Sequence, residues 1–382
     1  MSQLTDRLSQ YWNKIQGTLF PFLEEELDPL TEMQQRLITI LEITRIEQFL
    51  PDTFGFEGRP LKTRSALARS FVAKMVYNID TTSFLIERLK TDKNLRRICG
   101  WESLRELPSE STFSRAFANF AETALPQKAH EALIKKSFSD EVVLHKATDS
   151  TAIEAREKAE PQQKDDVKKE PRKKGRPKKG TEKSEKELTR IEKQTTMTLK
   201  EMLGDLPKGC NKGSKKDSKG NVTHWIGYKL HLDTVDGDIP VSAILTSASA
   251  HDSQAAIPLT AVTKERILFN CYDLMDAAYD APAIIEYSRS LGHIPIIDKN
   301  PRRDEELKLT KKMENLARKN LNLSLLEERH YNARSMAERA NARLKDEFGA
   351  NKVRVRGHAK VFCHLMFGVL ALAADQLVRL VT

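Results

Sequence analysis

Four polar residues near the C-terminus recur at a spacing that would place them on one face of a helix. They are Tyr331, Arg334, Glu338 and Lys345, which at about 100° per residue fall within a stripe roughly 60° wide. A guanidinium and an ammonium beside a carboxylate suit a phosphate backbone that lies across bound metal ions. The alternative is a solvated helix face that carries an Arg-Glu pair.

Two aspartates follow segments that we expect to form strands. Asp149 comes shortly after the apolar run 142–144, and Asp276 ends the mostly apolar segment 267–275. Both carboxylates could therefore lie at the same edge of one sheet. Taken singly, each aspartate could equally be a turn former or a helix cap.

Three carboxylates from distant parts of a chain suit the cleavage and transfer of phosphodiester bonds. Two divalent ions about 3.5–4 Å apart can neutralise charge on the attacking and the leaving oxygens. Hard cations such as Mg²⁺ prefer carboxylate ligands. We therefore predict Asp149, Asp276 and Glu338 as catalytic and metal-binding residues for two Mg²⁺ ions, which Mn²⁺ could replace.

The pattern from residue 142 onward predicts a mixed α/β sheet with helices packed on it. The expected order is strand 142–149, a hairpin of 226–232 and 239–246 around Asp236-Gly237, a helix after Asp252 or Ser253, strand 267–275, a helix with Pro282 in its first turn, strand 294–297, and a mainly helical C-terminus. This order predicts a ribonuclease-H-like fold, which places carboxylates at strand ends and on a late helix.

The first ~135 residues are expected to be all-helical, because their apolar positions recur at helical spacing. A helix from Thr112 to about Thr123, capped by Ser109 or Ser111, follows short helices and a tight turn. This arrangement is compatible with a helix-turn-helix unit that presents Ser111, Thr112, Ser114 and Arg115 to DNA. Alternatively, the segment is a helical cap on the catalytic domain.

Positive charge is concentrated in an insert at residues 155–222. This insert holds 21 Lys and Arg against 12 Asp and Glu, which equals the whole chain's net charge of +9. Such charge favours a polyanionic partner, either nucleic acid or an acidic membrane surface. Within the insert, residues 173–179 resemble an AT-hook, whose Arg176 could enter a narrow minor groove. A basic linker without groove preference is the alternative.

The remaining features favour a cytoplasmic, nucleoid-associated protein. The four cysteines stand far apart, the N-terminus lacks a secretory signal pattern, and the apolar run 361–374 is too short to span a membrane. We read this run as a buried C-terminal helix.

Further candidates lie outside the carboxylate set. His251 could bind a metal or carry a proton, although a hydrogen-bonded histidine at a strand end is more common. Lys299, Arg302 and Arg303 follow the last short strand and could clamp DNA or form a solvated loop.

The motifs together resemble bacterial insertion-sequence DDE transposases of the group with a Tyr-x2-Arg-x3-Glu-x6-Lys signature. Residues 331–345 fit that spacing without a gap, and three further motifs follow in the expected order: 225–232 with its Asp236-Gly237 turn, 250–253, and 275–280. The resemblance covers residues ~140–375, with a weaker likeness at 109–115. One departure is Ala278, where the family often has glycine.

The resemblance implies a role for each matching residue. Asp149, Asp276 and Glu338 would form the metal-binding triad, while Tyr331, Arg334 and Lys345 would contact phosphates at the element's end. The family pattern selects Asp276 over its neighbours Asp273 and Asp280.

The implied activity is the cutting of element ends and the joining of a 3′-OH to target double-stranded DNA, with at least a dimer during the reaction. Two rival functions share parts of this pattern. A ribonuclease-H-like nuclease would cut without joining, and a DNA-binding regulator derived from a transposase would do neither.

Overall fold

The computed structural model describes residues 29–50, 63–161, 188–216, 220–301, 304–321 and 326–380. Arg176, with the AT-hook-like motif around it, and Arg302 and Arg303 lie outside these ranges, so the predictions for them stay predictions.

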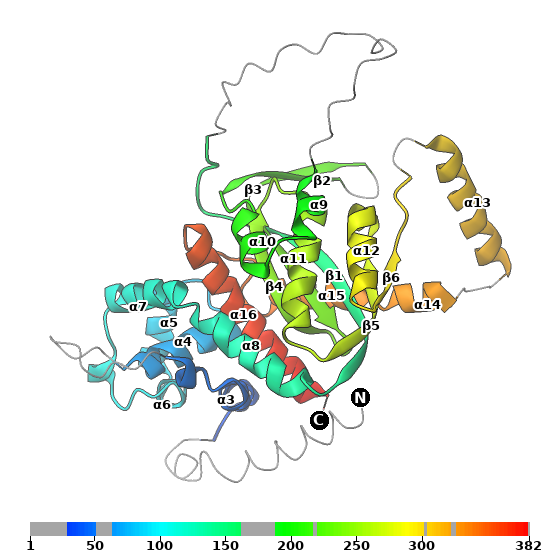
Figure 1. Cartoon of the computed structure of the whole chain (residues 1–382). Coiled ribbons are helices and arrows are strands. Elements are labelled where there is room, and N and C mark those ends of the chain that lie inside the picture. Colours follow the sequence, from blue (N-terminus) through cyan, green and yellow to red (C-terminus); the bar gives the residue numbers. More distant parts are fainter. Residues whose placement is uncertain are drawn as a thin grey trace.

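Helices alone precede the sheet in the described part of the chain, as the sequence predicts (Figure 1). They are α3 (Glu32–Thr44), η1 (Ile46–Phe49), α4 (Arg64–Val76), α5 (Thr82–Thr91), α6 (Lys93–Ile98), η2 (Leu104–Glu106), α7 (Glu110–Glu122) and α8 (Leu125–Phe138). On α7, Phe113, Phe117 and Phe120 recur at helical spacing and are buried. Their rings surround Phe71 of α4 at centroid distances of 5.0–6.2 Å. Aromatic packing therefore fixes α7 on this region.

One six-stranded mixed sheet follows. Its strands are β1 (Val142–Glu154), β2 (Asn211–Lys216), β3 (Val222–Val235), β4 (Ile239–Ser247), β5 (Phe269–Met275) and β6 (Ile294–Ile297). The order is β2-β3-β1-β5-β6, with β4 paired to β3. Strand β1 runs antiparallel to β3 and parallel to β5. The predicted hairpin of β3 and β4 is confirmed, and its turn uses Gly237 at φ +87°.

Helices cover both faces of this sheet (Figure 1). Helices α11 (Ser253–Lys264) and α12 (Pro282–Ser290) pack on one face, together with α9 (Arg190–Gln194) and α10 (Leu199–Asp205). Helices α15 (Ser335–Asp346) and α16 (His358–Arg379) contact the sheet from the other face. The predicted ribonuclease-H-like α/β class is confirmed, with a helical N-terminal region.

Helix α16 joins the helical region to the sheet. It packs on α3, α4, α7, α8 and β4. Phe367 stacks on Phe117 and contacts the Phe71 ring at a tilt of 38°. By length and composition α16 could cross a membrane, but 89% of its most apolar window is buried inside the protein. The predicted buried C-terminal helix is therefore confirmed, as the core helix of a folded body.

Part of the charged insert forms regular secondary structure. Its second half contains α9, α10 and the edge strand β2, which pairs with the start of β3. Thr189 and Thr198 begin the two helices with capping boxes that involve Glu192 and Glu201. Local capping and strand pairing therefore organise a segment that is poor in apolar residues.

Candidate active site

Parallel pairing of β1 with β5 places Asp149 beside Asp276. Ala147 is the register partner of Leu274, and the two aspartates follow two residues later on the same side of their strands. Asn341 of α15 donates a hydrogen bond to Asp149 at 3.0 Å. Burial raises the pKa of both carboxyls, and the nearby Asp276 raises that of Asp149 further. The two aspartates therefore lie side by side, as predicted, but the predicted strand end at Asp149 was wrong: β1 continues to Glu154 because it stays paired with β3 there.

Glu338 projects from α15 above the same strands. Met336 and Ala337 of this helix are buried against Ala147 and Leu274, which fixes α15 over the β1–β5 pair. The Glu338 side chain is 56% exposed, and it accepts a hydrogen bond from the Arg334 guanidinium. Glu338 therefore contacts Arg334 in this structure, one helical turn away.

The four signature residues do not lie on one continuous helix, so that part of the prediction was wrong. Tyr331 belongs to α14 (Leu326–Asn332), and Arg334 precedes the first residue of α15. Between the two helices, backbone N–H groups bond to carbonyls three residues back, as Arg334 does to Tyr331 at 2.9 Å. Such bonds tighten the chain into a 3₁₀-like turn.

The signature side chains nevertheless gather around the aspartates. The Arg334 guanidinium lies over the Tyr331 ring, 5.7 Å from its centroid. Its charge lowers the pKa of Asp149 and of Asp276, which burial otherwise raises. Burial lowers the pKa of the partly buried Lys345, and the carboxylate of Asp149 partly offsets this. Cationic side chains from both ends of α15 therefore act on Asp149.

The donor chemistry fits a hard divalent cation, because carboxylate oxygens are its preferred ligands. Across the described ranges, no group of three His, Cys, Asp or Glu side chains is arranged to hold a metal ion. Asp149 and Asp276 form a pair, and Glu338 is held by Arg334. These three side chains would supply the ligands.

A further acidic residue, Asp252, lies at this edge. The sequence predicted it as a helix cap and as a member of the family motif 250–253, but with no role in the site. Asp252 precedes α11 but makes no capping bond, and it accepts a hydrogen bond from Lys229 at 2.9 Å. Burial raises the pKa of Asp252, but His231 and Lys229 outweigh it and lower that pKa. Asp252 in turn raises the pKa of Asp276. No spacing rule would have found it, because its partner comes from another strand.

Asp273 points away from this edge, to the opposite face of the sheet. It is fully buried and pairs with the buried Lys146 at 3.1 Å, and Lys146 also lies 3.5 Å from Asp233. Burial disfavours the charge on Lys146, but the two aspartates outweigh it and raise the lysine pKa. Asp280, the other neighbour, accepts the backbone N–H of Asn300 at 2.9 Å. Neither aspartate joins the pair formed by Asp149 and Asp276.

Other predicted residues make contacts of their own. His251 is exposed, and its Nδ1 is hydrogen-bonded to Ser253 Oγ at 2.7 Å in a local turn. Arg115 is exposed on α7, beside Thr112. Lys299 is exposed, and its carbonyl accepts a bond from Lys311.

A hydrogen bond between two histidines connects α14 to β1. The sequence did not reveal this contact. His145 is hydrogen-bonded to Asp236 at 2.8 Å and to His330 at 2.8 Å. The His330 ring stacks on Tyr272, with 4.1 Å between centroids. These contacts hold His330 in place, and His330 directly precedes Tyr331.

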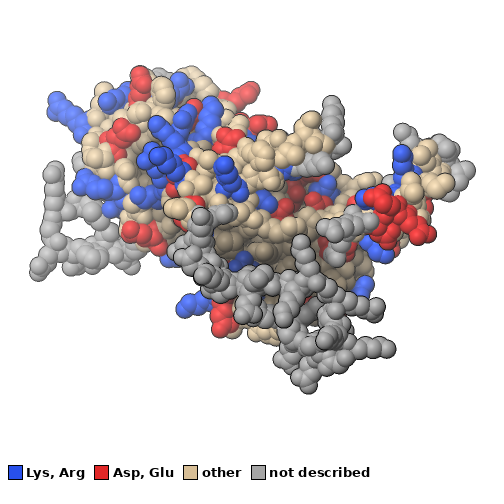
Figure 2. All heavy atoms as spheres, turned by 90° about the horizontal axis from the view of Figure 1, so that it is seen from above, with Lys and Arg blue, Asp and Glu red and all other residues tan. Residues whose placement is uncertain are grey.

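A cationic segment leads away from the site between α15 and α16. Lys352, Arg354 and Arg356 are exposed, whereas Val353 between them is buried. Alternation along an extended chain turns the cationic side chains to one side. Figure 2 shows Lys and Arg gathered on the side of the molecule that carries the early helices and the start of α16. The alternation of cations with valine could have predicted this strip.

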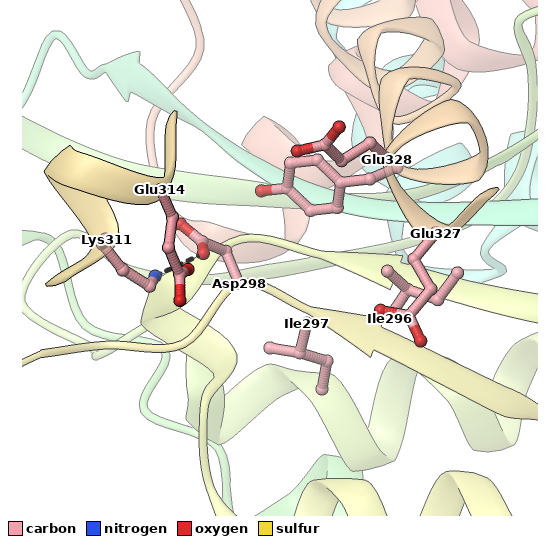
Figure 3. A pocket seen from close by; sticks show the side chains of 8 residues that line it. Ile296, Ile297, Asp298, Lys311, Glu314, Glu327 and Glu328 are labelled. Atoms are coloured by element: carbon pink, nitrogen blue, oxygen red, sulfur yellow. Dashed lines mark hydrogen bonds and ion pairs between the residues drawn. The ribbon is translucent and has the colours of Figure 1, made fainter. Parts of the chain in front are cut away.

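A pocket of about 410 Å³ lies next to the site, between β6, α14 and the projecting helix α13 (Glu305–Leu321). Figure 3 shows Asp298, Glu314, Glu327 and Glu328 around it, with Lys311 bonded to Asp298. Tyr331 also lines it, but none of the three predicted metal ligands does. Its lining is mainly acidic, which by charge alone disfavours phosphate.

Comparison with known families agrees with this geometry. The Transposase DDE domain family matches residues 144–374, and a Transposase domain family (DUF772) matches residues 22–119. No curated protein and no solved structure gave a match.

The first match spans the strands that carry Asp149 and Asp276 as well as α15. Members of this family are polynucleotidyl transferases that act on DNA and generally use divalent metal ions. The chain belongs to the DDE transposase family.

Proposed function

We propose that this transposase cuts DNA at the ends of its element and joins the freed 3′-OH to target DNA. The observation that carries the proposal is the pair of Asp149 and Asp276 on adjacent parallel strands, under a helix that presents Glu338 and Arg334. In the first step, water attacks the phosphodiester and the 3′ oxygen leaves. In the second step, that 3′-OH attacks a target phosphodiester and displaces its 3′ oxygen.

The protein residues contribute mainly positioning and charge. Asp149, Asp276 and Glu338 would hold two Mg²⁺ ions, or Mn²⁺ in their place, which when bound neutralise charge on the attacking and leaving oxygens. Arg334, stacked on Tyr331, would form charge-assisted hydrogen bonds with the phosphate, and Lys345 would add a second cation. Asn341 would keep the Asp149 carboxylate in place.

We further propose how DNA lies on the molecule. The strip formed by Lys352, Arg354 and Arg356 continues from Lys345 away from the carboxylates, and it would follow the phosphate backbone. Arg115 and the exposed face of α7 would contact DNA in a helical domain spanning residues 1–135. The basic insert at 155–222 and Arg302 and Arg303 would add phosphate contacts to the catalytic domain at 140–375. Two copies would act together on the nucleoid in the cytoplasm.

The test uses purified full-length protein, element-end DNA and Mg²⁺. Wild-type protein should nick the end and form joined products, whereas Glu338→Gln should lose at least ~10³-fold of both activities, because it removes a ligand charge. The matched control is Asp346→Asn, at the exposed end of the same helix, which should retain activity.

Three results would contradict the proposal. Equal activity of the Glu338→Gln variant would overturn the site assignment. Cutting without any joined product would identify a nuclease, and unchanged function after Asp149→Ala would favour a regulator.

A further inference from the structure

Among the residues that the structure describes, the hydroxyl of Tyr279 finds no hydrogen-bond partner, although the side chain is 1% exposed. Tyr279 lies in the short helix η3 (Ala277–Tyr279), directly after Asp276, and its ring packs with residues of α11 and α12. Leaving a buried hydroxyl unpartnered costs free energy. A phenylalanine would fill the same space without that cost, so the hydroxyl gains stability only in a state that provides a partner.

Several carboxylates lie close enough to this hydroxyl to act on it electrostatically. Burial raises the pKa of Tyr279 well above its usual range, and Asp252, Asp149 and Asp276 raise it further. The hydroxyl therefore stays protonated and can donate. Of these carboxylates, Asp252 acts on Tyr279 most strongly, and it lies at the start of α11, the helix against which the tyrosine ring packs.

The Asp252 carboxylate has hydrogen-bond partners of its own. Lys229 donates to it at 2.9 Å and also to the carbonyl of Ala250 at 2.8 Å, and Ser150 forms a hydrogen bond with the same carboxylate. Ser150 directly follows Asp149 on β1. A shift of the Asp252 carboxylate is therefore coupled to β3 through Lys229 and to β1, the strand that carries Asp149, through Ser150.

We propose that Tyr279 is a positioning residue of the metal-binding edge: when a divalent cation is bound there, its hydroxyl donates a hydrogen bond to Asp252 and orients this fourth carboxylate toward the site. Asp252 then adds negative charge next to Asp276, which strengthens cation binding. This inference rests on the proposed metal-dependent function. It assigns roles to two residues outside the triad and the signature.

The experiment measures Mn²⁺ binding to full-length protein without DNA, by the electron paramagnetic resonance signal of free Mn²⁺, and the melting temperature without metal. The variants are Tyr279→Phe, Asp252→Asn and their double mutant. The matched control is Tyr77→Phe. Its hydroxyl is also buried and finds no partner within the described ranges, but Tyr77 belongs to the chain just after α4.

Tyr279→Phe should weaken Mn²⁺ binding about 10-fold or more, the usual effect of removing a hydrogen bond behind a metal ligand. Its metal-free melting temperature should be unchanged or higher, which a merely structural tyrosine would not show. Tyr77→Phe should bind Mn²⁺ as wild type does. In the Asp252→Asn background, Tyr279→Phe should cause no further loss, because the tyrosine acts through that carboxylate.

Unchanged Mn²⁺ binding by Tyr279→Phe would overturn the inference, as would full additivity of the two losses. If Asp252→Asn fails to fold, the comparison of Tyr279→Phe with Tyr77→Phe alone decides whether the inference holds. A wild-type protein that binds no Mn²⁺ would overturn the proposed metal-dependent function. Wild-type binding with an unaffected Tyr279→Phe variant would overturn this inference only.

Discussion

Charged groups lie on both faces of the sheet, in opposite environments. On the face covered by α11 and α12, Lys146, Asp233 and Asp273 are fully buried and fully paired. On the face covered by α15, Arg334 pairs with Glu338, whose side chain is 56% exposed. Lys146 and Asp149 stand only three residues apart on β1, so one strand supplies both groups.

The two faces use charge differently: the buried network stabilises the fold, and the Arg334–Glu338 pair serves the chemistry. Thr148 and Thr263 donate hydrogen bonds to Asp233, and Ser288 donates to Asp273, so the buried carboxylates are saturated. Removing one member of such a group leaves an uncompensated buried charge. The exposed Arg334–Glu338 pair is screened by water and can exchange partners at little cost. The buried network therefore fixes the strands, while the exposed pair leaves Glu338 available to a ligand.

The largest expected effect comes from breaking the buried network. Lys146→Met should lower the free energy of unfolding by about 3–5 kcal/mol, because Asp233 and Asp273 would stay buried without their cation. Chemical denaturation monitored by circular dichroism measures this change.

The matched control is Lys74→Met on α4. Lys74 is also buried, but no ion pair or side-chain hydrogen bond of it is found in the described part of the chain, and burial lowers its pKa to about 8. Removing this charge should leave stability unchanged or raise it. If both variants lose the same stability, lost lysine packing explains the effect and the contrast between the faces fails.

Much of the site could be predicted because its residues follow local rules. An apolar run that ends at a carboxylate correctly marked the end of β5 before Asp276, whereas β1 runs past Asp149 to Glu154. Parallel pairing of the two strands still brings both aspartates together. The 3.6-residue period placed Glu338 and Lys345 on α15. It did not reveal the 3₁₀-like turn before Arg334, because such a turn alters the hydrogen bonds without altering the apolar period.

The remaining features depend on contacts between distant segments. Asp252 meets Lys229 and His145 meets His330 only after the sheet has formed. Helix α7 shares its aromatic core with α16, whose Phe367 lies some 250 residues later in the chain. Sequence periodicity describes one element at a time, so it could not give these partnerships.

The two faces should also respond differently to pH. Burial raises the pKa of Asp149 and Asp276 above the usual 3.8, and a metal must displace their protons. Mn²⁺ affinity should be highest above these raised pKa values and should fall about tenfold per pH unit as pH drops through them. Titrations from pH 7.5 to pH 4 measure this.

The buried network should not respond over that range. Burial alone would raise the pKa of Asp273, but Lys146 and His293 outweigh it and lower the pKa below 3.8. Its contribution to stability is therefore complete above pH 3.8 and is lost only at more acidic pH. An Mn²⁺ affinity that stays constant down to pH 4 would contradict the raised pKa of Asp149 and Asp276.

The smallest expected effect tests the exposed pair itself. Arg334→Gln should change the free energy of unfolding by less than ~1 kcal/mol, because a solvated ion pair contributes little. Without DNA, Mn²⁺ should bind about two- to fivefold more tightly, since the loss of a cation frees Glu338 and removes a repulsion of roughly 0.5–1 kcal/mol. DNA joining should nevertheless fall, because the phosphate contact is lost.

Arg339→Gln is the control for this variant. Arg339 lies on the same helix as Glu338, and it makes a comparable ion pair, at 2.6 Å, with Asp238. It should leave Mn²⁺ affinity unchanged. If Arg334→Gln instead weakens Mn²⁺ binding, then Arg334 helps to build the metal site and does not merely occupy Glu338. In that case the Arg334–Glu338 pair, like the buried network, would have a structural role.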